Sequence, residues 1–256
     1  MFTPRLHALG IVRVNKRVAC TKDCLKKGNG AMNEEFEQKL KTLDMSFLEL
    51  GMMVNVAVYR AVQAFTTHDK HLAYEVIASD EQINSRQMKI ERKCLELIAL
   101  QQPVTTSLRR IVTAMKASSD LERMGDHAVS IAKATIRLKG NPRVFSIESK
   151  LNKMFTVVRK MSDEVIDAYV HNDAHRAERI AARDHVVNKY SEDIYLACIN
   201  SMQADTETVV GGTDYMLVAS YIERIADYVT NICERVVYLQ TGKMVELNSS
   251  AKEDEF

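Results

Sequence analysis

Apolar residues recur every three or four positions along most of this chain, which is the spacing of one face of a helix. Between residues 34 and 67 they form a continuous stripe: Phe36, Leu40, Leu43, Phe47, Leu50, Val54 and Val58. Similar stripes predict five more helices, over residues 70–100, 105–138, 147–171, 173–203 and 208–240. Gln101-Gln102-Pro103 ends the second helix and Gly140-Asn141-Pro142 ends the third, because proline and glycine interrupt a helical backbone.

The pattern of the first half of the chain is repeated in the second half. A shift of 104 residues places Asp80 and Asn84 on Asp184 and Asn188. A shift of 101 residues places the stretch Glu122–Asp126 on Glu223–Asp227. Each half contains three predicted helices, so the sequence predicts an all-α fold, a tandem repeat of two three-helix bundles with six long helices.

Composition agrees with this fold class. Glycine (9) and proline (3) are scarce, so the many turns of a β-sandwich or barrel are missing. We predict a first bundle over residues 32–141, a second over 142–243 and an acidic C-terminal tail over 244–256. The best apolar stretch, Gly51–Val58, is followed by Arg60 and is far shorter than the roughly 18 residues that a membrane helix needs. We therefore predict that the chain is not an integral membrane protein.

Residues 1–31 differ in composition from the rest of the chain. They carry seven Lys and Arg residues and one acid, a charge of +6, which leaves the remaining residues at −5. They lack the apolar core of a secretory signal and the serines of a transit peptide. We predict that they form a disordered or non-native leader and that Asn33 caps the first helix. A net charge of −5 on the remaining residues does not favour contact with the phosphate backbone of a nucleic acid, so no direct binding to nucleic acid is expected.

A pair of carboxylates occurs at matching places in the two halves. Glu122 and Asp126 are four residues apart, as are Glu223 and Asp227, so each pair shares one helix face. Like charges at this spacing destabilise a helix by roughly 0.2–0.5 kcal/mol, and a bound hard cation would turn the repulsion into ligation. The pairs therefore indicate two metal sites. The alternative is a solvated acidic stripe that neighbouring arginines neutralise.

Signatures of common enzyme classes are missing from the sequence. It has no phosphate-binding glycine loop, no His-Glu-x-x-His, no Gly-x-Ser-x-Gly and no Glu-x-x-His of a di-iron oxidase. The histidines at predicted turns are expected to be exposed polar residues: His68, His71, His171 and His175. We predict no catalytic residue and no organic cofactor site. The cysteines of the helical body, Cys94, Cys198 and Cys233, lie in apolar contexts and are expected to be buried.

The residues around both carboxylate pairs resemble the two signature helices of the PhoU family. These stretches are Leu121–Ala132 (LERMGDHAVSIA) and Tyr221–Glu234 (YIERIADYVTNICE). Further support comes from Ile77–Ile83, Gln101–Pro103 and Tyr238–Gly242, and the similarity covers about residues 32–243. A doubled Glu-x-x-x-Asp motif within six long helices is a specific signal.

This resemblance implies two bundles related by a pseudo-twofold axis, with multinuclear iron or zinc clusters ligated by Glu122, Asp126, Glu223 and Asp227. It implies a cytoplasmic homodimer that contacts the ATPase of the phosphate ABC transporter and a sensor histidine kinase. The protein would reach the membrane only through these partners. Such a protein is a regulator and not an enzyme, and it reduces phosphate uptake and the starvation response when phosphate is plentiful.

Two residues depart from the family pattern. Ser107 stands where an acid usually precedes Leu-Arg, and Tyr228 stands where a histidine often follows the second motif, so weaker metal binding is expected. A second function class stays open, a metal-dependent hydrolase of phosphate compounds that uses the same carboxylates. It would need a nucleophile or base outside the metal ligands, and the sequence offers none at a telling spacing. A helical interaction protein without metal is the third class.

Overall fold

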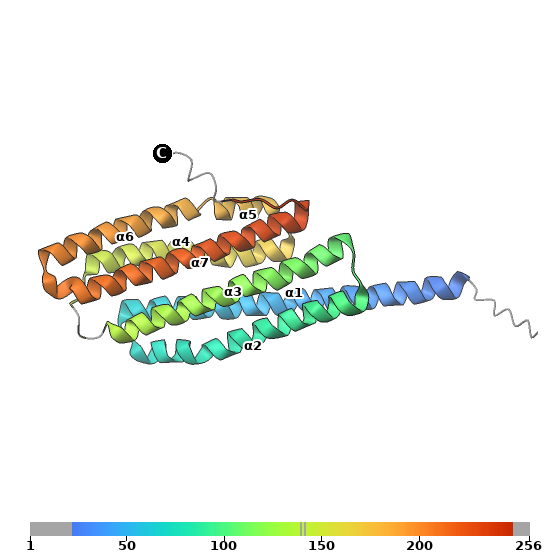
Figure 1. Cartoon of the computed structure of the whole chain (residues 1–256), viewed down its shortest axis with the longest axis horizontal. Helices are drawn as coiled ribbons and strands as arrows, with labels where there is room; N and C mark the ends of the chain where they lie inside the picture. The colour runs from blue at the N-terminus through green and yellow to red at the C-terminus, as the bar shows by residue number, and fades with distance from the viewer. Residues whose placement is uncertain (1–21, 139, 141, 248–256) are drawn as a thin grey trace, which may run out of the picture. The chain divides into compact units, whose positions relative to one another are not determined.

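The computed structural model describes residues 22–138, 140 and 142–247, with side chains from residue 34 onward (Figure 1). Contacts divide the chain into two units, Met1–Lys39 and Leu40–Phe256. The first unit contributes the start of helix α1 (Lys22–Thr67). There the exposed side chain of Lys39 pairs at 2.8 Å with Glu35, one helical turn earlier.

Helices make up the second unit, and no strand occurs in the part of the chain that the structure describes. The rest of α1 is followed by α2 (Lys70–Gln101), α3 (Thr105–Arg137), α4 (Phe145–His171), α5 (Ala174–Ala181), α6 (Asp184–Ala204), the 3-10 helix η1 (Thr206–Thr208) and α7 (Val209–Thr241). Helices α1 to α3 lie side by side, and α4 to α7 form a second group (Figure 1). The predicted all-α fold with two tandem helical bundles is confirmed.

The start of the first helix was predicted wrongly. Helix α1 begins at Lys22, so Asn33 lies inside it and does not cap it. No proline occurs between Lys22 and Asn33, and the two glycines there, Gly28 and Gly30, weaken the helix without ending it. Residues 1–21 of the predicted leader and residues 248–256 of the predicted tail lie outside the described residues.

The fifth predicted helix, over residues 173–203, is interrupted and forms α5 and α6. The interruption falls at Ala182 and Arg183, and both residue types favour helices. At the break the amide of Arg183 donates to the carbonyl of Ile180, three residues earlier, and Nη2 of Arg183 lies 2.7 Å from Oε2 of Glu164 on α4. The residue types at the break do not signal it.

Equivalent aspartates begin the second helix of each repeat. Oδ1 of Asp69 accepts a 3.1 Å hydrogen bond from the Leu72 amide at the start of α2, and Oδ1 of Asp173 accepts one of 2.9 Å from the Arg176 amide at the start of α5. A cap of this kind contributes about 1 kcal/mol. The matching geometry shows that the sequence repeat is also a repeat of local structure.

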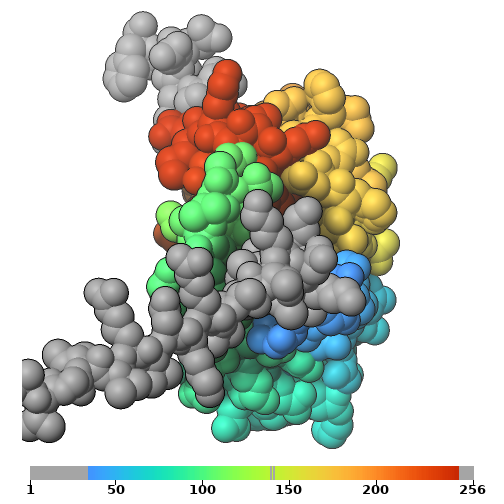
Figure 2. Space-filling view, turned by 90° about the vertical axis from the view of Figure 1, so that its right-hand side faces the viewer, coloured from blue at the N-terminus to red at the C-terminus, as the bar shows by residue number. Residues whose placement is uncertain are grey.

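The two repeats share a hydrophobic core. The apolar stripe of α1 is buried from Leu40 onward, and the ring of Phe47 lies 3.9 Å from that of Tyr169 on α4, centroid to centroid. A Cβ atom on Gly51 would lie 2.6 Å from Cδ1 of Ile166, so glycine allows α1 and α4 to approach closely. On the other side α3 packs on α7, and Figure 2 shows the green surface of α3 against the red surface of α7.

The Glu34–Thr67 part of α1 has the length and composition of a membrane-spanning helix, with a mean hydropathy of 1.2 in its most apolar window. It is more apolar than we predicted from the lengths of its uncharged runs. Half of that window is buried inside the fold, and a core helix of a bundle has the same composition. Burial of its stripe against the other helices therefore accounts for the high hydropathy.

A buried glutamate joins segments from both repeats. Glu148, at the start of α4, is 5% exposed. Its Oε1 atom accepts hydrogen bonds from the Tyr215 hydroxyl at 2.7 Å and from Nε of Arg143 at 3.1 Å, and it lies 3.1 Å from Nε2 of His68. Burial raises the pKa of Glu148, but these hydrogen bonds together lower it by more than burial raises it. The net pKa is therefore below the ordinary value. His68 is therefore a contact of this buried site and not simply an exposed turn residue.

We expect Glu148→Gln to destabilise the protein by about 2 kcal/mol at neutral pH, because the charged hydrogen bond to Arg143 is lost. A lowered pKa favours folding of the ionised form, so this stabilisation is present above the ordinary value of 4.5 and is lost as pH falls through the lowered folded value. Urea unfolding of both proteins from neutral to strongly acidic pH should show the gap closing. Glu49→Gln, at an exposed ion pair with Arg86, is the matched control, and an equal effect of the two changes would contradict the prediction.

Candidate metal centres at the repeated carboxylates

The first carboxylate pair lies on one face of α3. The side chains of Glu122 and Asp126 are 24% and 41% exposed. Between them, Gly125 lets α2 come close: a Cβ atom there would lie 3.3 Å from Cγ2 of Ile83 and 3.9 Å from Oδ1 of Asp80. The absence of a side chain at Gly125 thus brings a third carboxylate, Asp80 of α2, to the predicted pair.

Three carboxylates of the first repeat repel one another. Burial raises the pKa of Asp80 and the charge of Asp126 raises it further, and burial followed by Asp126 does the same to the pKa of Glu122. Oδ2 of Asp80 accepts a 3.2 Å hydrogen bond from Nδ2 of Asn84, whereas Oδ1 is buried and has no hydrogen-bond partner in the described structure. An uncompensated buried oxygen beside two more carboxylates is an environment that a cation would stabilise.

The second pair lies on α7 in an equivalent arrangement. Oε2 of Glu223 accepts a 2.6 Å hydrogen bond from the hydroxyl of Ser191 on α6. Asp184 of α6 is 4% exposed. Its pKa is raised by burial first and also by the charge of Glu223, against a hydrogen bond of 3.2 Å from Asn188 that lowers it. Asp227 is exposed on the same helix face.

Asp80 and Asp184 were not predicted as site residues. Their only signal was the internal repeat, which aligns both aspartates and also the asparagines four residues later. The structure gives that alignment a meaning, because the amide-to-carboxylate hydrogen bond is 3.2 Å long in both halves. A search for carboxylates that repeat together with their hydrogen-bond donors would have found them.

The donor set fits a hard cation by its chemistry, since the candidate ligands are carboxylate oxygens. The geometry is looser than a formed centre: among the described residues, no three His, Cys, Asp or Glu side chains are gathered closely enough to hold a metal ion. Arg123 also lies 3.7 Å from Oε2 of Glu122 and 3.5 Å from Oδ2 of Asp126. The acidic stripe neutralised by arginine is therefore present at the first pair, at long ion-pair distances.

Aromatic rings that neighbour the carboxylate pairs in sequence stack between α3 and α7. The ring of His127 stacks on those of Tyr221 and Tyr228, with centroids 5.7 and 5.8 Å apart. Burial and then the charge of Arg224 lower the pKa of His127. Tyr228 departs from the pattern of the family that the sequence resembles. It thus packs on His127, the residue at the equivalent position of the first repeat.

A family model described as the PhoU domain matches the chain twice, over residues 47–135 and 151–236. The chain belongs to the PhoU family. A PhoU homologue of Streptococcus pneumoniae serotype 4 is 38% identical over 217 residues, which is 85% of this chain and 100% of that protein. A PhoU homologue of Clostridium acetobutylicum is 38% identical over 214 residues, 83% of this chain and 97% of that one.

Solved PhoU structures share the fold. The crystal structure of PhoU from Streptococcus pneumoniae has a TM-score of 0.77 at 37% identity, covering 82% of this chain and 99% of that one. PhoU from Pseudomonas aeruginosa has a TM-score of 0.76 at 30% identity, covering 81% of this chain and 100% of that one. Each of the two domain matches includes one carboxylate pair, so both pairs lie in the part of the chain that matches the family.

Proposed function

We propose that this chain is an accessory regulator of phosphate-specific transport that acts by contact and not by catalysis. The two PhoU domain matches, one over each repeat, carry the proposal. Relatives aligned along 97–100% of their own length are named phosphate-specific transport system accessory proteins. The similarity is therefore to whole regulatory proteins and not to a domain within a larger enzyme.

The proposed partners are the ATPase of the phosphate ABC transporter and a sensor histidine kinase, contacted by a cytoplasmic homodimer. Helices α2, α3 and α7 contain 32, 33 and 33 residues, which gives faces about 50 Å long at 1.5 Å per residue. Long rigid faces suit a protein that binds other proteins. The charge of −5 outside the basic N-terminal residues supports control of genes through a protein and not through direct contact with DNA.

We further propose that Glu122 with Asp126, and Glu223 with Asp227, ligate iron or zinc. Asp80 and Asp184 would supply a third carboxylate in each repeat. The support is the raised pKa of Asp80, Glu122 and Asp184 and the uncompensated buried oxygen of Asp80. A bound cation would neutralise the repulsion and hold α2 against α3 and α6 against α7.

Removing one carboxylate pair is expected to remove one of two metal sites. Asp126→Ala and Asp227→Ala should each lower the metal content by about half, and the double change should abolish it. Elemental analysis of protein purified without added metal or chelator measures this, with the exposed Asp193→Ala as control. Metal at a hundredfold excess over Kd should stabilise the parent protein by roughly 2.7 kcal/mol. Full metal content in the double variant would place the sites elsewhere.

Deletion of the gene tests the regulatory role. We expect phosphate uptake and the starvation genes to stay switched on in phosphate-rich medium, because the contact that represses them is gone. Restoration by the parent gene is the control, and a gene with Glu122, Asp126, Glu223 and Asp227 all changed to Ala tells whether the carboxylates take part. Normal phosphate control in the deletion strain would contradict the proposal. Phosphatase turnover by the purified protein that is lost in the fourfold variant would support the metal-dependent hydrolase instead.

A further inference from the structure

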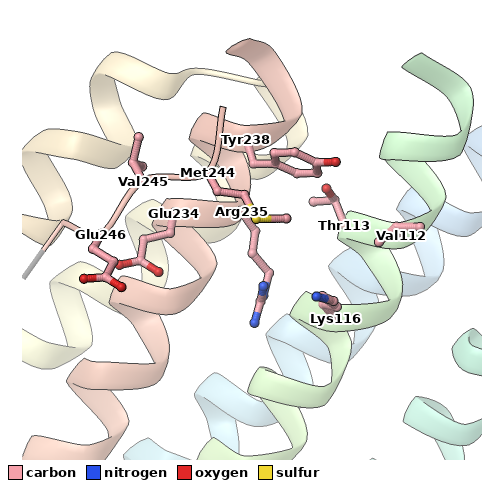
Figure 3. A pocket seen from close by; sticks show the side chains of 9 residues that line it. All are labelled: Val112, Thr113, Lys116, Glu234, Arg235, Tyr238, Met244, Val245 and Glu246. Carbon is pink, nitrogen blue, oxygen red and sulfur yellow. The ribbon is translucent and has the colours of Figure 1, made fainter. Parts of the chain in front are cut away.

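A pocket of about 260 Å³ lies between α3 and α7, away from the carboxylate pairs (Figure 3). One wall comes from α3, a second from α7, and the chain after α7 closes one side with Met244, Val245 and Glu246. The amide of Leu247 donates a 2.9 Å hydrogen bond to Oε1 of Glu234, which holds this segment against α7. The pocket is thus formed by both repeats and by the segment that follows the last helix.

A buried hydroxyl in this pocket lacks a partner. Thr113 of α3 is 2% exposed, and its Oγ1 atom has no hydrogen-bond partner within the described residues. Buried polar groups are nearly always hydrogen-bonded, so an exception that lines a cavity points to a ligand. Tyr238 of α7 lines the same pocket as Thr113 of α3 (Figure 3), so each of the two helices contributes a residue with a hydroxyl group.

Two cations line the same pocket. Lys116 extends from α3 and Arg235 from α7 (Figure 3). One carboxylate faces both of them: Oδ2 of Asp120 accepts a 2.7 Å hydrogen bond from Nε of Arg235, and Lys116 acts electrostatically on the same carboxyl. Two positive charges against one negative charge leave this wall positive.

The other groups of the pocket define what surrounds the positive wall. Glu234 and Glu246 lie together on the side away from Lys116 (Figure 3). Val112, Met244 and the ring of Tyr238 provide apolar surface between the two charged sides. An anionic head therefore fits at the Lys116 side, and a short apolar body fits against Met244.

We propose that this pocket binds a small organic anion, with a phosphate or carboxylate head held by Lys116, Arg235 and the Thr113 hydroxyl. The apolar body of the ligand packs on Tyr238 and Met244. The proposal does not depend on the regulatory role above. A bound anion contacts α3 of one repeat and α7 of the other, so it strengthens the junction between them.

Calorimetric titration of the full chain with phenyl phosphate, benzoate, inorganic phosphate and benzyl alcohol tests this proposal. Phenyl phosphate or benzoate should bind saturably at one site per chain, and which of them binds more tightly identifies the head group. Inorganic phosphate, which lacks the apolar body, should bind more weakly, and benzyl alcohol, which lacks the charge, should not bind. If neither phenyl phosphate nor benzoate binds saturably, the proposal is overturned.

Two variants tie the binding to these residues. Lys116→Gln should weaken binding of the tighter-binding probe by about tenfold, because one charged hydrogen bond is lost. Thr113→Val should also weaken binding of this probe. The melting temperature should stay unchanged or rise, because the substitution removes an unsatisfied buried hydroxyl. A residue with a purely structural role would lose stability together with affinity. Lys153→Gln, an exposed lysine on α4, is the control for lost charge. Equal affinity in all three variants and the parent would place the binding outside the pocket.

Discussion

Phe47→Ala is expected to destabilise the protein by about 4 kcal/mol, because it removes a large side chain from the centre of the core. Phe47 is 0% exposed, and its ring lies against Tyr169 of the other repeat. The helices around it are held by other contacts and can only partly collapse into the cavity. Urea unfolding at neutral pH measures the loss.

Met45→Ala is the matched control for the core prediction. Met45 lies two residues away on α1 with 57% of its surface exposed, so its truncation should change the stability by less than about 0.5 kcal/mol. A loss below about 1 kcal/mol for Phe47→Ala would mean that the junction between α1 and α4 is not packed as described.

Arg235→Met is expected to destabilise the protein by about 3 kcal/mol, because it leaves the carboxylate of Asp120 buried without its charged hydrogen-bond donor. The side chain of Asp120 is 12% exposed and that of Arg235 is 29% exposed. Burial raises the pKa of Asp120, and the hydrogen bond from Arg235 opposes that rise. In the variant the folded pKa rises further, so protonation relieves the cost, and the deficit should shrink as pH falls.

A second substitution separates a lost contact from a stranded charge. Asp120→Asn together with Arg235→Met removes the buried charge and should recover most of the stability. Arg60→Met breaks an ion pair with Glu75 in which both side chains are about 40% exposed and should cost no more than about 1 kcal/mol. If Arg235→Met and Arg60→Met had the same effect at every pH, burial of Asp120 would not be the cause.

Features that depend on local sequence were predictable. From Leu40 onward the apolar stripe of α1 is its buried face, and the second helix ends at Gln101, directly before Gln102-Pro103. Cys94, Cys198 and Cys233 are buried as predicted. These outcomes follow from helical periodicity and from the backbone limits of proline, which act within a few residues.

Features that depend on contacts between helices were not predictable. Ala182 and Arg183 favour a helix by themselves, yet α5 ends and α6 begins there, where Arg183 pairs with Glu164 on α4. Asp80 joins the first carboxylate pair because Gly125 lets α2 approach α3, and no spacing within α2 signals this. Both carboxylate pairs could be predicted from the sequence, because the two members of each pair lie on one helix.

The hydrogen bonds between the repeats join residues that are distant in the chain. Asn55 donates to Asp163 at 3.0 Å and Arg137 donates to Asp214 at 2.9 Å. Such contacts form only after long loops have closed, so the chain should fold more slowly than a bundle of local contacts. A chain with a single repeat would leave the face around Phe47 open to water, and it would need a second copy of itself to cover that face. Each repeat is a complete unit of sequence but only half of a folding unit.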